Sequence, residues 1–214
     1  MAFLLRIELP DVPGSLGGVA TALGSAGADI EAIEIVERRS DGTVVDDVLL
    51  QLPSSVMPDA LVTACHALPG VAVQWISRYT AGANLSLDLE TVEAFTAEPA
   101  FAIERMVELL PDTFRSDWAV AVAADGADLL VRAASPTAPK LGESAHSWTS
   151  VASAQRLETL PEWESTVLAG APGKDRDGRA FVVVLGRHGG PAFLDSEVAR
   201  LGHMVSLAAS VQGE

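Results

Sequence analysis

A short turn near the N-terminus carries residue types that suit the binding of a zwitterion. Asp11, Pro13 and Gly14 stand between an alternating apolar stretch and a helical pattern, which places Gly14 just before a helix. The first amides of a helix lack partners within it and lie at the positive end of its dipole, so they can hold a carboxylate. Asp11 can accept hydrogen bonds from an ammonium group, and we expect Asp29, at the start of the next strand, to lie near it.

A plainer interpretation of the same turn stays open. Asp11 can serve only to stabilise the turn, and Gly14 only to supply a positive φ angle. In that case the turn binds nothing.

The sequence gives weak support for catalysis elsewhere. Residues 142–146 (GESAH) begin like a nucleophile elbow, but His146 stands where the second glycine belongs. Residues 170–175 place Lys174 beside a glycine without the spacing of a phosphate-binding loop. We expect no catalytic residue and no cofactor, while an enzyme with its site among Ser144, His146 and Lys174 is kept as an alternative.

No metal site is expected either. The single cysteine, Cys65, lies on the apolar side of a predicted helix, where a buried and inert thiol is the default. The histidines are far apart in the sequence, with no pair at helical ligand spacing. They are His66, His146, His188 and His203.

The composition is that of a folded acidic protein. Of 214 residues 49% are hydrophobic, and 29 acidic residues against 14 basic ones give a net charge of −15. This charge repels phosphate backbones and anionic lipids, so neither nucleic acid nor membrane is an expected partner. The longest apolar stretch, 118–124, has the length of a strand. The lone thiol and the lack of a secretion signal predict a cytoplasmic location.

The elements that position the turn follow a recognisable order. Apolar residues alternate in the strands and recur at three- or four-residue steps in the helices. The order βαββαβ over about 78 residues predicts a ferredoxin-like antiparallel sheet with two helices on one face. The predicted elements are strands at 2–9, 30–36, 44–52 and 71–77, and helices at 16–27 and 57–68.

The remainder predicts a second α+β domain with an antiparallel sheet. A connector helix at 87–98 precedes a helix at 103–110, which we expect to end at Pro111. Hairpins follow at 118–134 and 166–185, separated by a loop at 136–147, and Asp195 or Ser196 begins a last helix. The predicted division is domain 1–79, connector 80–98 and domain 99–214.

Residues 9–16 (LPDVPGSL) and 26–33 (AGADIEAI) resemble the opening of an ACT domain. That family has the βαββαβ plan, pairs into dimers and commonly binds amino acids at a subunit interface to regulate enzymes or transcription. The resemblance covers about residues 1–79. The ligand-binding residues that it implies are Asp11, Val12, Pro13, Gly14, Ser15, Leu16, Asp29 and Ile30. Because two of them are acidic, a ligand with a positive group is favoured and an acidic amino acid is disfavoured.

The later part is similar in layout to a GAF domain, with residues 193–197 (FLDSE) opening the last helix. GAF domains sense small molecules and form dimers. Together the resemblances predict a noncatalytic, allosteric regulatory sensor that binds an amino acid or a related metabolite in a homodimer or larger assembly. A ligand-free dimerisation or interaction protein is the alternative, and an enzyme with its site in the C-terminal domain is a third.

Overall fold

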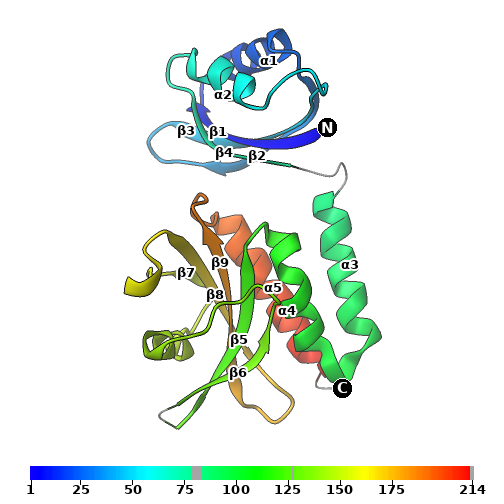
Figure 1. Cartoon of the computed structure of the whole chain (residues 1–214), viewed down its shortest axis with the longest axis vertical. Coiled ribbons are helices and arrows are strands. Elements are labelled where there is room, and N and C mark those ends of the chain that lie inside the picture. Colours follow the sequence, from blue (N-terminus) through cyan, green and yellow to red (C-terminus); the bar gives the residue numbers. More distant parts are fainter. Residues whose placement is uncertain (79–82, 127, 213–214) are drawn as a thin grey trace. The chain divides into compact units, whose positions relative to one another are not determined.

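The computed structural model describes residues 1–78, 83–126 and 128–212, and the chain forms two compact units, Met1–Ala83 and Asn84–Glu214. Each unit has its own antiparallel sheet with helices against it, which confirms the predicted α+β class (Figure 1). None of the helices in the described part of the chain is long and apolar enough to span a membrane.

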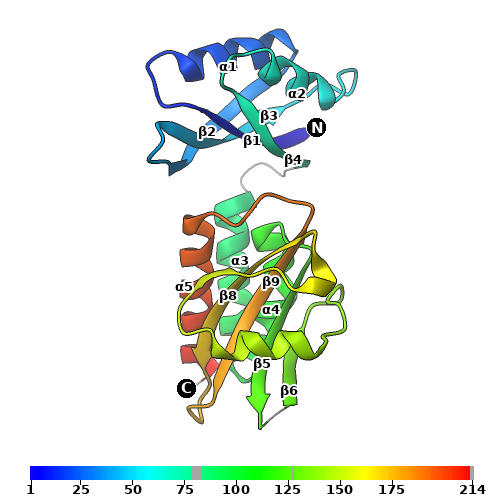
Figure 2. The ribbon, with the colours of Figure 1, turned by 90° about the vertical axis from the view of Figure 1, so that its left-hand side faces the viewer.

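The first unit has the predicted βαββαβ order. Its sheet runs β2-β3-β1-β4 with every neighbouring pair antiparallel. Figures 1 and 2 show both helices on one face of this sheet. The elements are β1 (Ala2–Pro10), α1 (Ser15–Ser25), β2 (Asp29–Arg38), β3 (Thr43–Gln51), α2 (Asp59–His66) and β4 (Ala72–Arg78).

The core of the first unit lies between the sheet and its helices. Alternate residues of β1 enter this core, because successive side chains of a strand point to opposite faces. Each helix adds one apolar side, with Val19 and Leu23 buried from α1 and Leu61 and Cys65 from α2. The expectation of a buried thiol at Cys65 is therefore confirmed, and burial raises the pKa of that thiol.

The opposite face of the same sheet holds a buried ion pair. Arg6 of β1 donates two hydrogen bonds to the carboxylate of Asp47 of β3, at 2.7 and 2.8 Å. Both side chains are more than nine-tenths buried, and the guanidinium lies 6.0 Å from the ring centroid of Trp75. The pair links β1 to β3 on the face of the sheet that does not pack against the helices.

The second unit has a five-stranded sheet in the order β6-β5-β9-β8-β7. Helices α4 and α5 pack on one face of this sheet together with Phe95 of α3, while η2 lies against the other face. The elements are α3 (Ala83–Ala97), η1 (Pro99–Phe101), α4 (Ala102–Phe114), β5 (Trp118–Asp125), β6 (Asp128–Ala134), η2 (Glu143–Ser150), β7 (Gln155–Leu157), η3 (Pro161–Trp163), β8 (Thr166–Lys174), β9 (Ala180–His188) and α5 (Asp195–Gln212).

Three indole rings fill the layer between β5 and the η segments. Trp118 lies 6.2 Å from Trp148 and 5.5 Å from Trp163, and these last two are 5.5 Å apart between ring centroids. Trp118 fits because it faces Gly186 on β9, where any Cβ would come within 2.1 Å of the indole. Trp118 is buried in this layer, whereas Trp75 of the first unit is half-buried.

Two local predictions are wrong. The helix expected to end at Pro111 continues to Phe114, and it ends at Arg115, whose φ is 48°. Arg187 donates hydrogen bonds to the carbonyls of Phe114 and Arg115, and carbonyls at the end of a helix lack amide partners within it. These bonds stabilise the last turn, although Pro111 lacks an amide hydrogen to donate. The segment expected to be a loop at 136–147 enters η2 at Glu143.

Candidate functional site

The turn before α1 has the conformation that the sequence predicts. Gly14 has a φ of 96°, in the left-handed region, and is the N-cap of α1 with no side-chain hydrogen bond at the cap. The Ser15 amide donates to the Val12 carbonyl at 3.2 Å, and the first bond of the helix joins the Gly18 amide to the Gly14 carbonyl at 3.0 Å. The intervening amides of the first turn have no capping side chain, and residues 11–14 are exposed. An anion can therefore reach this helix end.

Asp11 already has a cationic partner. Its carboxylate accepts a hydrogen bond from Arg38 at 2.6 Å, with 46% of the Asp11 side chain and 61% of the Arg38 side chain exposed. Ion pairs this exposed contribute about 0 to 1 kcal/mol, so a ligand can displace the pair at small cost. Sequence reasoning missed Arg38, which reaches Asp11 from the far side of β3, where Val44 pairs with both Leu9 of β1 and Arg38 of β2.

A second carboxylate near the turn was also missed. Asp46 of β3 is 1% exposed and lies opposite Ile7 and Ile35, on the face that the helices cover. Its Oδ1 atom has no hydrogen-bond partner. Burial raises the pKa of Asp46, the charge of Arg38 lowers it and the charge of Asp11 raises it. Asp46 therefore lies within electrostatic range of both groups at the turn.

The alternation of β3 explains why Asp46 has no partner. Neighbouring residues of a strand, such as Asp46 and Asp47, point to opposite faces. Asp47 meets Arg6 on the uncovered face, whereas Asp46 enters an apolar layer. Burying a carboxylate among apolar side chains destabilises the fold unless a bound group compensates its charge.

One chain does not bring Asp29 and Ile30 to the turn. Asp29 begins β2 and pairs with Gln51, which pairs in turn with Ala2 at the start of β1. Asp11 follows the opposite end of β1, about nine residues and roughly 30 Å along the sheet. The expectation that Asp29 lies near Asp11 is wrong within a single chain.

The residues of the enzymatic alternative are not assembled. Ser144 donates its hydroxyl hydrogen to Glu162, and this hydrogen bond lowers the pKa of Glu162. The Nε2 atom of His146 is buried without a hydrogen-bond partner. Within residues 1–78, 83–126 and 128–212, no hydrogen bond or ion pair joins Ser144, His146 and Lys174, and no group of three or more His, Cys, Asp or Glu residues is placed to hold a metal ion.

No protein-family model and no curated protein matches this sequence. Among solved structures, the chain is similar to the GAF domain of Acinetobacter phosphoenolpyruvate-protein phosphotransferase, at 14% identity and a TM-score of 0.46 over 62% of this chain and 94% of that one. It is similar to the Agobacterium tumefaciens repressor BlcR, at 13% identity and a TM-score of 0.33 over 95% and 83% of the two chains. Its likeness to a Pseudomonas putida formyltetrahydrofolate deformylase has 16% identity and a TM-score of 0.31, and covers 44% of this chain and 38% of that enzyme.

Proposed function

We propose that this chain is a noncatalytic regulatory sensor that binds an amino acid at the turn before α1. The observation that carries the proposal is the accessible N-terminus of α1, opened by the left-handed Gly14 and left without a side-chain cap. The carboxylate of an amino acid suits the amides of this helix end. The resemblance of residues 1–79 to an ACT domain points to the same turn.

The ammonium group of the ligand is directed to the acidic side of the turn. Asp11 lies on the turn itself, and Asp46 is a buried carboxylate with one oxygen that has no partner. Leaving a buried polar atom unpaired costs about 1 to 3 kcal/mol, and a cation bound nearby offsets that cost. Neutral and basic amino acids are therefore favoured. Aspartate and glutamate are disfavoured, because their second carboxylate meets Asp11 or Asp46 in a chain of net charge −15.

A homodimer completes the site. Asp29 and Ile30 belong to the binding residues that the ACT resemblance implies, yet in one chain they lie at the far end of the sheet from Asp11. A second copy related by two-fold symmetry can supply both residues. The strand that carries them, β2, is an edge strand, and unpaired edges are natural places for two copies to join.

Calorimetric titration of the full chain with serine, lysine and glutamate tests the proposal. We expect serine or lysine to bind at least tenfold more tightly than glutamate. Tightest binding by glutamate would overturn the assignment of Asp11 and Asp46. Dimers that bind none of the three support the alternative, in which the first unit joins two copies and senses nothing.

A further inference from the structure

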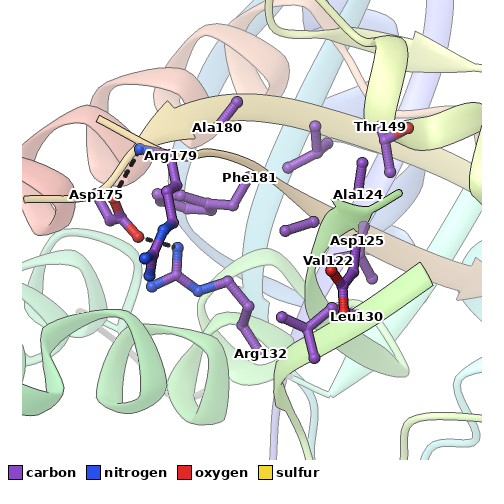
Figure 3. Close-up of a pocket in the computed structure, with 12 residues that line it drawn as sticks. Val122, Ala124, Asp125, Leu130, Arg132, Thr149, Asp175, Arg179, Ala180 and Phe181 are labelled. Atoms are coloured by element: carbon purple, nitrogen blue, oxygen red, sulfur yellow. Dashed lines mark hydrogen bonds and ion pairs between the residues drawn. The ribbon is translucent and has the colours of Figure 1, made fainter. Parts of the chain in front are cut away.

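A cavity of about 530 Å³ lies in the second unit, which does not contain the turn before α1. The pairing of β5 with β9 ends at Val122 and Val182. Beyond that point the β5–β6 pair continues to Asp125 and the β8–β9 pair continues to Lys174. The two hairpins therefore extend separately past the shared sheet, and the cavity lies between them (Figure 3).

Arg132 crosses from one hairpin to the other. The register of β5 and β6 shifts at this residue, since Val131 and Ala133 pair with consecutive residues of β5 and Arg132 is the extra residue of a bulge. Its guanidinium donates to Asp175 of the β8–β9 hairpin at 2.8 Å and lies 5.2 Å from the ring centroid of Phe181. These two contacts hold the cation in place at the cavity wall.

Arg179 approaches the same carboxylate from the hairpin tip. Its backbone amide donates to Asp175 at 2.8 Å, and Figure 3 shows its side chain running toward that of Arg132, so the two guanidinium groups lie beside each other. The acidic group nearest to the Arg179 guanidinium is Asp177, at 3.6 Å, and both of these side chains are at least two-thirds exposed. Asp177 does not line the cavity. One end of the cavity thus has two guanidinium groups and one carboxylate.

Opposing effects act on the Asp175 carboxyl. Burial raises its pKa, but the Arg179 amide and the Arg132 charge outweigh burial, and the pKa falls below its ordinary value. Asp175 is therefore an anion that organises both arginines and uses its oxygens in doing so. Asp175 binds Arg132 through Nη1 of the guanidinium but binds Arg179 through its backbone amide.

We propose that this cavity binds a small organic oxyanion, a carboxylate or a phosphate monoester joined to an apolar body. Guanidinium groups suit both anions, because their planar N–H pairs match two oxygen atoms at once. Phe181, Val122 and Val182 give the cavity an apolar wall for the body of the ligand. Asp125 lines the cavity away from the arginines (Figure 3), so the ligand carries its negative charge at one end.

Titration of the full chain with benzoate, phenyl phosphate and benzamide tests the site. Benzamide has the shape of benzoate without its charge. We expect at least one of the two oxyanions to bind, and benzamide to bind at least tenfold more weakly. The comparison of benzoate with phenyl phosphate decides between the two kinds of oxyanion. Binding of benzamide as tight as that of the oxyanions, or of no probe at all, would overturn the proposal.

Two arginines of the same hairpin provide a matched pair of variants. Arg179→Gln removes a guanidinium that lines the cavity but keeps the backbone bond to Asp175, so the hairpin should still fold. Arg176→Gln removes an exposed charge that does not line the cavity. We expect at least a tenfold loss of oxyanion affinity for the first variant and less than a twofold loss for the second. Equal affinities in the two folded variants would contradict the site.

The helix end at Gly14 is a second place where an oxyanion can bind, so the two sites must be told apart. Gly14→Val changes the turn and leaves the second unit untouched, and we expect it to keep the affinity for the oxyanion. Arg132→Gln provides an independent check from the other hairpin, provided that its thermal unfolding shows a folded second unit. Loss of benzoate and phenyl phosphate binding in Gly14→Val alone would place the anion site at the turn and overturn this inference.

Discussion

A substitution at Gly14 should affect ligand binding much more than folding. An added Cβ at Gly14 has no described heavy atom within 4 Å, so the space that a side chain would occupy is open to a ligand. At a φ of 96° a branched side chain strains the backbone by an amount on the order of 2 kcal/mol. We expect Gly14→Val to remain folded and to lose more than tenfold in amino-acid affinity, as measured by calorimetry.

Gly189 supplies the control for that variant. Its φ is 62°, it also has open space around the Cβ position, and it lies in the second unit, which does not contain the turn. Gly189→Val should show a similar loss of stability with its amino-acid affinity retained. If a folded Gly14→Val bound as tightly as Gly189→Val, the ligand site would have to be elsewhere.

Asp46 makes a pH-dependent contribution to the stability of the first unit. Because burial raises its pKa in the folded chain, the folded state binds the proton more tightly than the unfolded state between the ordinary and the raised pKa. Stability from this residue is present at low pH and is lost as the pH rises through that window. We expect Asp46→Asn to stabilise the unit by about 1 kcal/mol at neutral pH and by less at pH 4, in denaturant titrations at both pH values.

The residues of the turn illustrate what a sequence can predict. Pro13 and Gly14 restrict the backbone locally, so the turn and the start of α1 could be placed without knowledge of the fold. The pairing of Asp11 with Arg38 and the burial of Asp46 depend on strand register and on which face the helices cover. These features arise from contacts between distant segments, which a pattern within one segment does not contain.

At the scale of elements, the ion pair between β1 and β3 gives a sharp prediction. Asp47→Asn removes the buried carboxylate that accepts two hydrogen bonds from Arg6, and breaking such a pair costs about 3 to 5 kcal/mol. The neighbouring variant Asp46→Asn removes a carboxylate of the same strand from the other face and should stabilise the unit by about 1 kcal/mol at neutral pH. Hydrogen exchange of the β1 amides measures the difference, and similar exchange rates in the two variants would contradict it.

The fit of β5 to β9 depends on a glycine. Gly186→Ala places a Cβ 2.1 Å from the Trp118 indole, which neighbouring rings hold in place, so we expect a loss of about 1 to 3 kcal/mol or more. Gly170→Ala, on the adjacent β8, meets the flexible end of Leu157 at 2.9 Å and should cost less. Thermal unfolding of the two variants tests the order. If Gly170→Ala were less stable than Gly186→Ala, the indole cluster would have to move aside more easily than the end of the Leu157 side chain.

Elements long enough to show an apolar pattern were predicted well, and elements that are very short or depend on distant contacts were not. The strands of the first unit and the hairpin at 118–134 have a clear apolar pattern, because one or both faces are buried. The three residues of β7 are too few to show a period. The extension of α4 past Pro111 depends on Arg187, which lies more than 70 residues later in the sequence.

At the scale of the whole molecule, the distance between Asp11 and Asp29 within one chain predicts a complementation experiment. Light scattering should first show at least twice the mass of one chain. If each site combines the turn of one chain with Asp29 of the other, a heterodimer of Gly14→Val and Asp29→Ala chains has one intact site and one with both changes. We expect the mixed population to recover amino-acid binding that neither homodimer shows at full strength.

The mixing experiment has two controls. Each variant mixed with itself should keep its own weak binding, and the affinity of the recovered sites should equal that of the unchanged protein. A chain that is monomeric at micromolar concentration, or a mixture that recovers no binding, would contradict a site shared between two copies.

The three packed indoles of the second unit also give the protein a spectroscopic marker. Their ring centroids lie 5.5 to 6.2 Å apart, close enough for their electronic transitions to couple and to produce an exciton signal in circular dichroism. Trp75 belongs to β4 of the first unit and stands apart from this cluster in the sequence. The exciton signal therefore reports unfolding of the second unit alone. If it persisted while the fluorescence emission of Trp75 shifted, the first unit would be unfolding before the second.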